Sequence, residues 1–134
     1  INLFGKNGFD IPLTVLIDQD AEAKLAKKLQ ITPDQLLDRN VHISRTDLED
    51  EYVAALGVDK LWNALSTSPT FKPNQITNFT KQFKHSVPDQ SELATLCRDK
   101  DYKTHCAVLA CSFLTRETAS RITSVNEVLN EVFS

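Results

Sequence analysis

The chain has 134 residues, of which 41% are hydrophobic and 25% charged, and its net charge is −3 at pH 7. This length suits one domain with a core, and the charge excludes a protein that is strongly basic throughout, as many nucleic-acid binders are. No apolar stretch approaches the ~18 residues of a membrane span, so we expect no membrane partner.

The predicted elements begin with a short, β-branched strand over residues 12–17, after an irregular segment over residues 1–11. Asp18 or Asp20 is then expected to cap a helix over residues 21–29. A second, short helix is expected to start at Thr32, which is followed by proline and then by glutamine at the third helical position.

A second apolar strand is predicted over residues 41–44. Two strands joined by a helical connection of this length form a parallel, right-handed βαβ unit. The next helix is expected from Thr46 to Leu56 and to end at Gly57.

The rest of the chain shows only helical patterns. Helices are predicted over residues 58–65, 74–85 and 102–113. Another is expected to follow a capping box that starts at Asp89, and the last is expected to follow a cap at Ser124. The predicted fold class is therefore α/β: a small parallel sheet in residues 1–57, followed by a helical part in residues 58–134.

Two acidic pairs follow the two predicted strands. Asp18 and Asp20 come after the first strand, and Asp47 and Glu49 come after the second. The carboxyl ends of parallel strands are where α/β proteins form sites, and carboxylate oxygens are the ligands that Mg²⁺ and Mn²⁺ prefer. Four acids at one edge would repel one another without a cation. The pattern predicts a site for one or two divalent ions.

A structural interpretation of the same residues stays open. Asp20 could serve only as a helix cap, and residues 46–49 fit a capping box without a metal ion. Acids in a first helical turn are also favoured by the helix dipole. Two pairs after consecutive strands nevertheless favour a functional role.

The order of these motifs resembles the Toprim domain of the OLD family of endonucleases. The resemblance runs from Ile11-Pro12 through the strand, Asp18-x-Asp20, an alanine-rich helix, the second strand and Asp47-Leu48-Glu49 to Ala55-Leu56-Gly57. The later helices, with Tyr102-Lys103-Thr104-His105-Cys106, are similar to the helical C-terminal part of that family. The chain would then be the C-terminal portion of a Toprim nuclease domain.

The resemblance implies metal-dependent hydrolysis of DNA phosphodiesters, with a role in phage defence. Asp18 and Asp20 would hold one Mg²⁺ or Mn²⁺, and Asp47 and Glu49 would hold a second ion or its waters. Lys103, with Lys100 as the second choice, would act beside the scissile phosphate. The catalytic set implied is therefore Asp18, Asp20 and Lys103.

The same resemblance implies partners beyond this chain. Toprim enzymes carry a glutamate in an upstream strand-to-helix turn, and OLD proteins carry an ABC-type ATPase before the Toprim domain. Neither that turn nor a phosphate loop of the GxxxxGK[ST] type occurs in the sequence. We expect that the first half of the domain has been removed from this chain, or that another chain supplies it, or that this piece is inactive alone. The ATPase would likewise belong to the same polypeptide or to another chain. The resemblance also implies a homo-oligomer and, in some cases, a helicase-like partner.

Basic residues outside the acidic motifs suggest a DNA contact. Residues 71–86 contain Lys72, Lys81 and Lys84 and no acid, so these lysines are predicted to bind the DNA backbone. The three cysteines include no CxxC motif, which argues against a zinc ribbon and favours reduced, mostly buried thiols in a cytoplasmic protein. His42 is expected to be partly buried and not a ligand, and Trp62 to lie in the core.

Two other classes of function remain open. Haloacid-dehalogenase-type phosphatases also carry an Asp-x-Asp motif after a strand, but they need a threonine soon after the second aspartate, where this chain has Ala21-Glu22-Ala23. Nucleotide-sugar glycosyltransferases need a longer chain. The chain could also be a non-catalytic interaction module that completes a larger assembly, and metal binding would distinguish that role.

Overall fold

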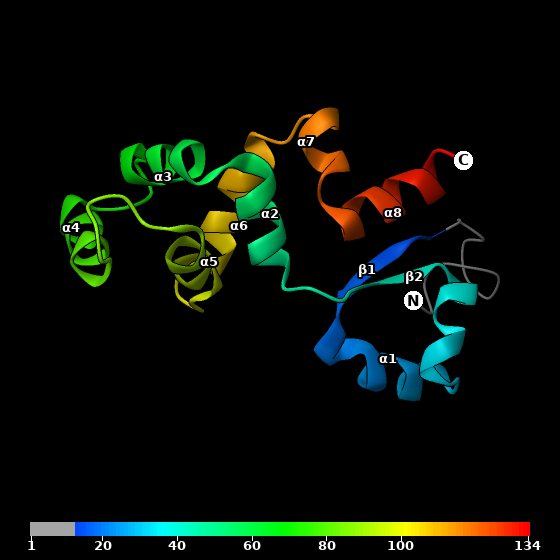
Figure 1. Ribbon diagram of the computed structural model, residues 1–134. Coiled ribbons are helices and arrows are strands. Elements are labelled where there is room, and N and C mark those ends of the chain that lie inside the picture. Colours follow the sequence, from blue (N-terminus) through cyan, green and yellow to red (C-terminus); the bar gives the residue numbers. More distant parts are fainter. Residues whose placement is uncertain (1–12) are drawn as a thin grey trace. The chain divides into compact units, whose positions relative to one another are not determined.

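The computed structural model describes residues 13–134 of the chain (Figure 1). Within these residues the protein is mixed α/β and mostly helical, with 66% of them in helices and a small parallel sheet of two strands. The irregular segment predicted over residues 1–11 lies outside the described residues. In the described part of the chain, no helix is long and apolar enough to cross a membrane.

The sheet pairs β1 (Val15–Asp18) with β2 (Val41–Ser44) in parallel. The register places Val15 opposite Val41 and Asp18 opposite Ser44. The structure therefore confirms both predicted strands and their parallel pairing. The first strand starts three residues later than predicted and includes Asp18.

The connection between the strands differs from the prediction in its second half. It begins with the 3-10 turn η1 (Gln19–Ala21) and helix α1 (Glu22–Leu29). The predicted helix from Thr32 to near Asn40 is wrong, because this segment forms two 3-10 turns, η2 (Pro33–Gln35) and η3 (Leu37–Arg39). Asn40 adopts a left-handed conformation (φ 56°), and Val41 N–H then donates to the Leu36 carbonyl at 3.0 Å. This reversal leads into β2 too soon for a regular helix to form.

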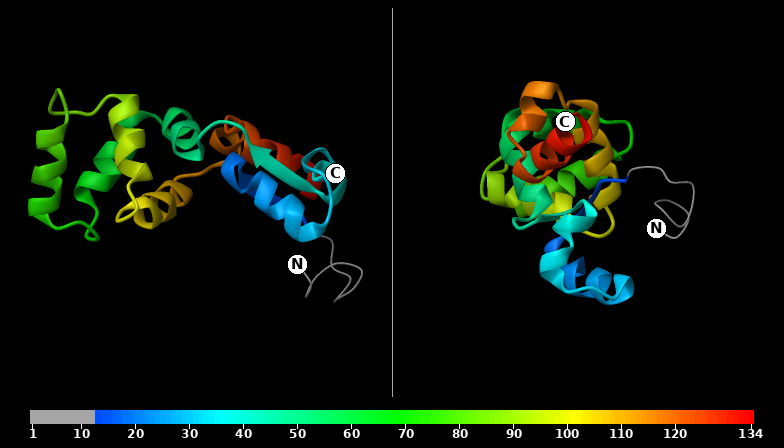
Figure 2. Two further views of the ribbon diagram at one scale, coloured as in Figure 1. Left: turned by 90° about the horizontal axis from the view of Figure 1, so that it is seen from below. Right: turned by 90° about the vertical axis from the view of Figure 1, so that its right-hand side faces the viewer.

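Alternating side chains of the two strands face opposite sides of the sheet. On one side, Val15, Ile17 and Ile43 pack with a buried cluster made by α1, η2 and β2, whose members are Ala26, Leu36 and Val41. On the other side, α8 (Thr123–Val132) contacts both strands. Figure 1 and the left view of Figure 2 both show α8, in red, alongside β2.

The chain divides into two compact units. Unit 1 comprises residues 1–46 and 123–134, and unit 2 comprises residues 47–122. This division differs from the predicted one, which put a boundary after residue 57 and assigned the last helix to the helical part. The reason is that α8 returns to pack against the strands of unit 1.

Unit 2 is a helical assembly built around α2. Its helices are α2 (Leu48–Leu56), α3 (Val58–Thr67), α4 (Pro73–Gln82), α5 (Gln90–Arg98), α6 (Lys103–Ser112) and α7 (Arg116–Ser120). Helix α2 contacts α3, α5, α6 and α7. Val53, Leu61 and Leu93 are fully buried in this core, and Trp62 is buried as predicted.

Local signals in the sequence explain most of the helix ends in unit 2. Gly57 ends α2 with φ 87°, a conformation that glycine adopts without strain. The predicted capping box is confirmed, because Glu92 N–H donates to Asp89 and the Glu92 carboxylate accepts from Asp89 N–H. The last helix starts two residues earlier than predicted: α8 begins at Thr123, and Ser124, the expected cap, is buried within it.

Candidate functional site

Asp18 and Asp20 lie at the carboxyl end of β1, and both are exposed. The prediction that one of them caps the next helix is wrong. Asp18 stands at the N-cap of η1 without a capping hydrogen bond from its side chain, and α1 has Ala21 at its N-cap. No hydrogen bond or ion pair within residues 13–134 involves either carboxylate. The cap interpretation therefore does not explain this acidic pair.

The residues at the end of β2 do not neutralise that pair. Ser44, opposite Asp18, is buried, and its hydroxyl donates to the Thr46 carbonyl. Arg45 is exposed and forms a two-pronged ion pair with Glu22 of α1, with its shortest N–O distance at 2.8 Å. The charge of Arg45 is thus matched by Glu22, and the charges of Asp18 and Asp20 have no cationic partner within the described part of unit 1.

Asp47 has a structural role in unit 2. One carboxylate oxygen accepts a hydrogen bond from Glu49 N–H at 3.0 Å, which makes Asp47, and not Thr46, the N-cap of α2. The other oxygen accepts from Arg98 Nε at 2.6 Å. A hydrogen bond from the Glu49 side chain and the Arg98 guanidinium lower the pKa of Asp47. The cap that the sequence left open as an alternative is present at Asp47.

Glu49 is the buried acid of this group. Only 5% of its surface is exposed, and Lys103 Nζ lies 3.2 Å from its Oε1. Burial raises the pKa of Glu49, the neighbouring Asp47 raises it further, and Lys103 opposes the shift. Unit 2 thus brings together Asp47, Glu49 and Lys103, which the sequence had singled out from two distant segments.

Arg98 is the member of this group that sequence reasoning missed. Besides Asp47, its guanidinium contacts Asp50 at 3.0 Å. Arg98 is in the last turn of α5, about fifty positions from either partner in the chain, so no local spacing links them. Lys100, the second choice for the basic residue, is exposed.

The two acidic pairs belong to different compact units. Asp18 and Asp20 are in unit 1, and Asp47 and Glu49 are in unit 2. The expectation that they share one metal site stays a prediction. Within residues 13–134, no group of three or more His, Cys, Asp or Glu side chains is arranged to hold a metal ion.

The lysines predicted to bind DNA are on or beside α4. Lys72 is at its N-cap, Lys81 is in its last turn and Lys84 follows it, and all three are exposed. Exposure is what a contact to phosphate requires, and DNA binding by these residues stays a prediction.

The remaining titratable residues lie mostly inside the two units. His42 is 9% exposed, as expected for a partly buried residue, and its Nδ1 lies 4.0 Å from Glu127 Oε2. All three thiols are free, as predicted. Cys97 and Cys106 are buried and Cys111 is exposed.

No protein-family model, curated protein or solved structure matches this chain. A functional assignment must therefore be argued from the residues and their contacts.

Proposed function

We propose that the chain is the C-terminal portion of a Toprim-type nuclease domain of the OLD kind, and that it takes part in metal-dependent hydrolysis of DNA in phage defence. The observation that carries the proposal is the pair Asp18 and Asp20. Both carboxylates lie at the carboxyl end of a parallel strand. Within residues 13–134, neither caps a helix and neither forms an ion pair with a basic side chain.

The donor set at β1 fits a hard divalent cation. Two exposed carboxylates separated by one residue repel each other, and a cation between them removes that repulsion. Mg²⁺ is commonly held by one or two carboxylates while it keeps several of its waters, so this pair would suffice without a cage of protein ligands. A bound Mg²⁺ or Mn²⁺ would supply charge neutralisation and an activated water for phosphodiester hydrolysis.

The Glu49–Lys103 pair supports a role for Lys103 beside a phosphate. The Lys103 side chain is half-exposed, with 51% of its surface accessible, while its partner Glu49 is buried. A buried carboxylate can hold the lysine in place beside the position of an incoming phosphate. We assign Glu49 as the positioning residue for Lys103, and its role as a metal ligand stays a prediction. Asp47 is already used to cap α2 and to pair with Arg98.

Metal binding tests the proposal directly. Titration calorimetry with Mg²⁺ and with Mn²⁺ should show binding by the wild-type chain and a loss of about tenfold or more in affinity for Asp18→Asn and Asp20→Asn, since each removes one charged ligand. Asp34→Asn is the matched control, because Asp34 is also exposed and changes the net charge equally. Unchanged binding in Asp18→Asn would refute the site.

Cleavage of plasmid DNA tests the catalytic part. With Mn²⁺, Asp18→Ala should abolish cleavage while circular dichroism and the melting temperature stay close to those of the wild type. Cleavage that survives this substitution in purified protein contradicts the assignment. If the wild-type chain binds metal and does not cleave, the same assay is made on a longer parent that contains the upstream glutamate turn. A parent that still does not cleave would favour the alternative of a non-catalytic module completing a larger assembly.

A further inference from the structure

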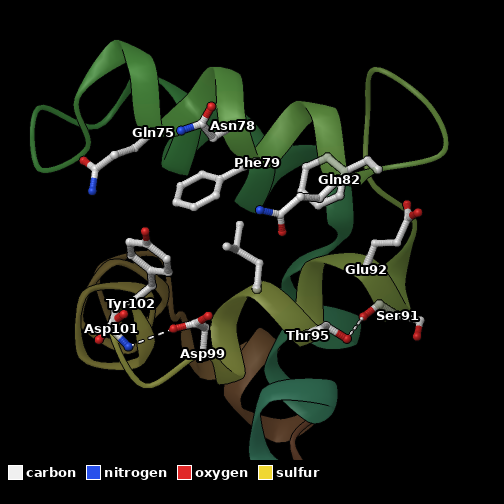
Figure 3. A pocket seen from close by; sticks show the side chains of 12 residues that line it. Gln75, Asn78, Phe79, Gln82, Ser91, Glu92, Thr95, Asp99, Asp101 and Tyr102 are labelled. Atoms are coloured by element: carbon white, nitrogen blue, oxygen red, sulfur yellow. Dashed lines mark hydrogen bonds between the residues drawn. The ribbon is translucent and has the colours of Figure 1, made fainter.

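Unit 2 contains a cleft of about 410 Å³ between α4 and the corner where α5 leads into α6 (Figure 3). Its floor is aromatic. The rings of Phe79 and Tyr102 meet edge to face, with centroids 4.7 Å apart, and Figure 3 shows the Phe79 ring directed from α4 toward Tyr102. Phe79 is itself buried, so the partly exposed ring of Tyr102 is the one that can stack against a flat group of a ligand.

One wall of the cleft is a row of side-chain amides on α4. Gln75, Asn78 and Gln82 are spaced by three and four residues, so they share one face of the helix. The amide groups of Asn78 and Gln82 make no hydrogen bond within the described residues. Each offers a donor and an acceptor, which is the pair of groups that a peptide backbone requires.

The charge of the cleft is negative. Glu92, Asp99 and Asp101 line it, and no Lys, Arg or His does. Both Glu92 oxygens already accept backbone N–H groups, from Lys84 and Asp89. Asp99 uses one oxygen to accept from Asp101 N–H, so its other oxygen and the Asp101 carboxylate remain available beside Tyr102.

We propose that this cleft binds an extended, arginine-containing peptide segment of a partner protein. The guanidinium would stack on Tyr102 and donate to Asp99 and Asp101, since Arg is planar, carries donors in a fixed fork and pairs with both carboxylates and aromatic faces. The row of amides on α4 would hold the peptide backbone on either side. The proposal is independent of the nuclease assignment, because none of these residues belongs to the acidic pairs. Asp99 accepts a backbone hydrogen bond from Lys103 N–H at 2.7 Å, and a change of the Asp99 side chain leaves that carbonyl in place.

Other ligand classes fit the cleft less well. The acidic lining repels a nucleotide or nucleic acid through its phosphates. A neutral sugar would use the amides and the rings but leave the carboxylates at Asp99 and Asp101 without a counter-charge. Of the lysines predicted to contact DNA, Lys81 comes two positions after Phe79, about 200° around the helix. Lys72 and Lys84 adjoin the cleft through backbone N–H groups that donate to Gln75 and Glu92, but their side chains do not line it.

An NMR titration of the complete ¹⁵N-labelled chain tests the proposal. The probe is acetyl-Gly-Ser-Arg-Ser-Gly-amide, and its control is the same peptide with citrulline, which keeps the shape of arginine without the charge. We expect saturable shifts of the Asn78 and Gln82 side-chain amides and of the Asp99–Tyr102 backbone, with a Kd on the order of 1 mM for so short a peptide. The citrulline peptide should bind at least about tenfold more weakly.

A variant with both acids replaced, Asp99→Asn with Asp101→Asn, should bind the arginine peptide no better than wild type binds the citrulline peptide. Asparagine at position 99 can still accept from the backbone N–H of residue 101, so the turn is retained. Asp34→Asn with Asp38→Asn is the control for net charge, because both acids are exposed and neither lines the cleft. Absence of shifts, shifts outside the cleft, or equal binding of the two peptides would each overturn the proposal.

Discussion

At the scale of single residues, Glu49 has the most unusual environment among the acids of the candidate site. It is almost fully buried and depends on Lys103 for a counter-charge. Because burial raises its pKa above the ordinary value of 4.5, the folded protein keeps a proton at Glu49 to a higher pH than the unfolded chain does. The stability contributed by Glu49 is therefore greatest at low pH and is lost as the pH rises through its folded pKa.

Replacing Lys103 should enlarge this pH dependence. In Lys103→Met the counter-charge is gone, the pKa of Glu49 rises further, and we expect a loss of about 1–3 kcal/mol in the free energy of unfolding near neutral pH, with a smaller loss near pH 4. Urea unfolding at both pH values measures this loss of stability, with Lys100→Met as the control. In the double variant Glu49→Gln with Lys103→Met, most of the difference between the losses at the two pH values should disappear. Equal losses at both pH values would contradict the assignment.

Two substitutions of Asp47 distinguish the contribution of the helix cap from that of the ion pair with Arg98. Asp47→Ala removes both, and we expect it to cost about 1 kcal/mol of stability, as lost N-caps do. Asp47→Asn keeps a capping oxygen and should cost less.

The pH dependence of Asp47 has the opposite sign to that of Glu49. Because the pKa of Asp47 is lowered below 3.8 in the folded state, its stabilisation is present above that pH and is lost as the pH falls through the folded pKa. Thermal unfolding between pH 2 and pH 7 should therefore show that wild type loses its advantage over Asp47→Asn at the acid end. A constant difference would argue against this ion pair.

At the scale of elements, α8 is the least expected feature of the fold. Its hydrophobic spacing predicts a helix with one buried face, and the structure shows that this face covers the sheet. A two-stranded sheet has too little core to be stable alone, so it needs a helix on each side. The β1–β2 pair should therefore depend on α8.

Removing α8 tests that dependence. A chain that ends at Ile122 should lose the hydrogen-exchange protection of amides in β2, while amides in the core of unit 2, such as those of Leu61 and Leu93, keep theirs. Removing only Phe133 and Ser134, which are exposed, is the control. Protection of β2 that survives loss of the whole helix would show that the sheet does not need this cover.

Elements that are determined by residues within their own segment were predictable from the sequence. Elements that depend on contacts or backbone conformations outside the hydrophobic pattern were not. Strand 41–44, Gly57 and the box at Asp89 are fixed by β-branched, glycine and capping residues. Helix α7 was not predicted, because its cap pairs Thr115 with Thr118 and lacks the usual Glu or Gln. The turns at 33–39 were predicted as a helix, because the left-handed Asn40 that shortens them is not apparent from hydrophobic spacing.

The same contrast holds for the candidate site. Both acidic pairs could be found from the strands that precede them, and Lys103 entered through the family resemblance and not through its spacing. Arg98 could not be found, since its contacts with Asp47 and Asp50 join segments far apart in the chain. A cap was expected from Asp18 or Asp20, but neither side chain makes one, because a 3-10 turn that sequence spacing does not reveal precedes α1.

At the scale of the whole molecule, the three cysteines report on how unit 2 opens. Cys111 is exposed and should react quickly with a thiol reagent in the native protein, whereas buried Cys97 and Cys106 should react only when unit 2 unfolds. One fast and two slow equivalents are therefore expected, and Cys111→Ser should remove the fast one. The burst of colour released by a disulfide reagent measures this directly, and two or more fast equivalents would contradict the burial.

The division into units could not be read from the sequence for a related reason. An amphipathic pattern indicates that one face of a helix is buried but not which partner buries it. Residues 123–134 look like one more helix after a run of helices, and only the three-dimensional contacts show that they belong with β1 and β2.

The return of α8 to the sheet has a consequence for how the protein is made. The two strands leave the ribosome early, residues 47–122 follow, and the helix that covers the strands is translated only after that. At about 5–20 residues per second, this delay lasts on the order of several seconds. Unit 2 can fold in that interval, while the face of the nascent sheet that carries Leu16 and His42 stays open to solvent and to chaperones. Slowing translation between the codons for Ser44 and Thr123 would lengthen that exposure.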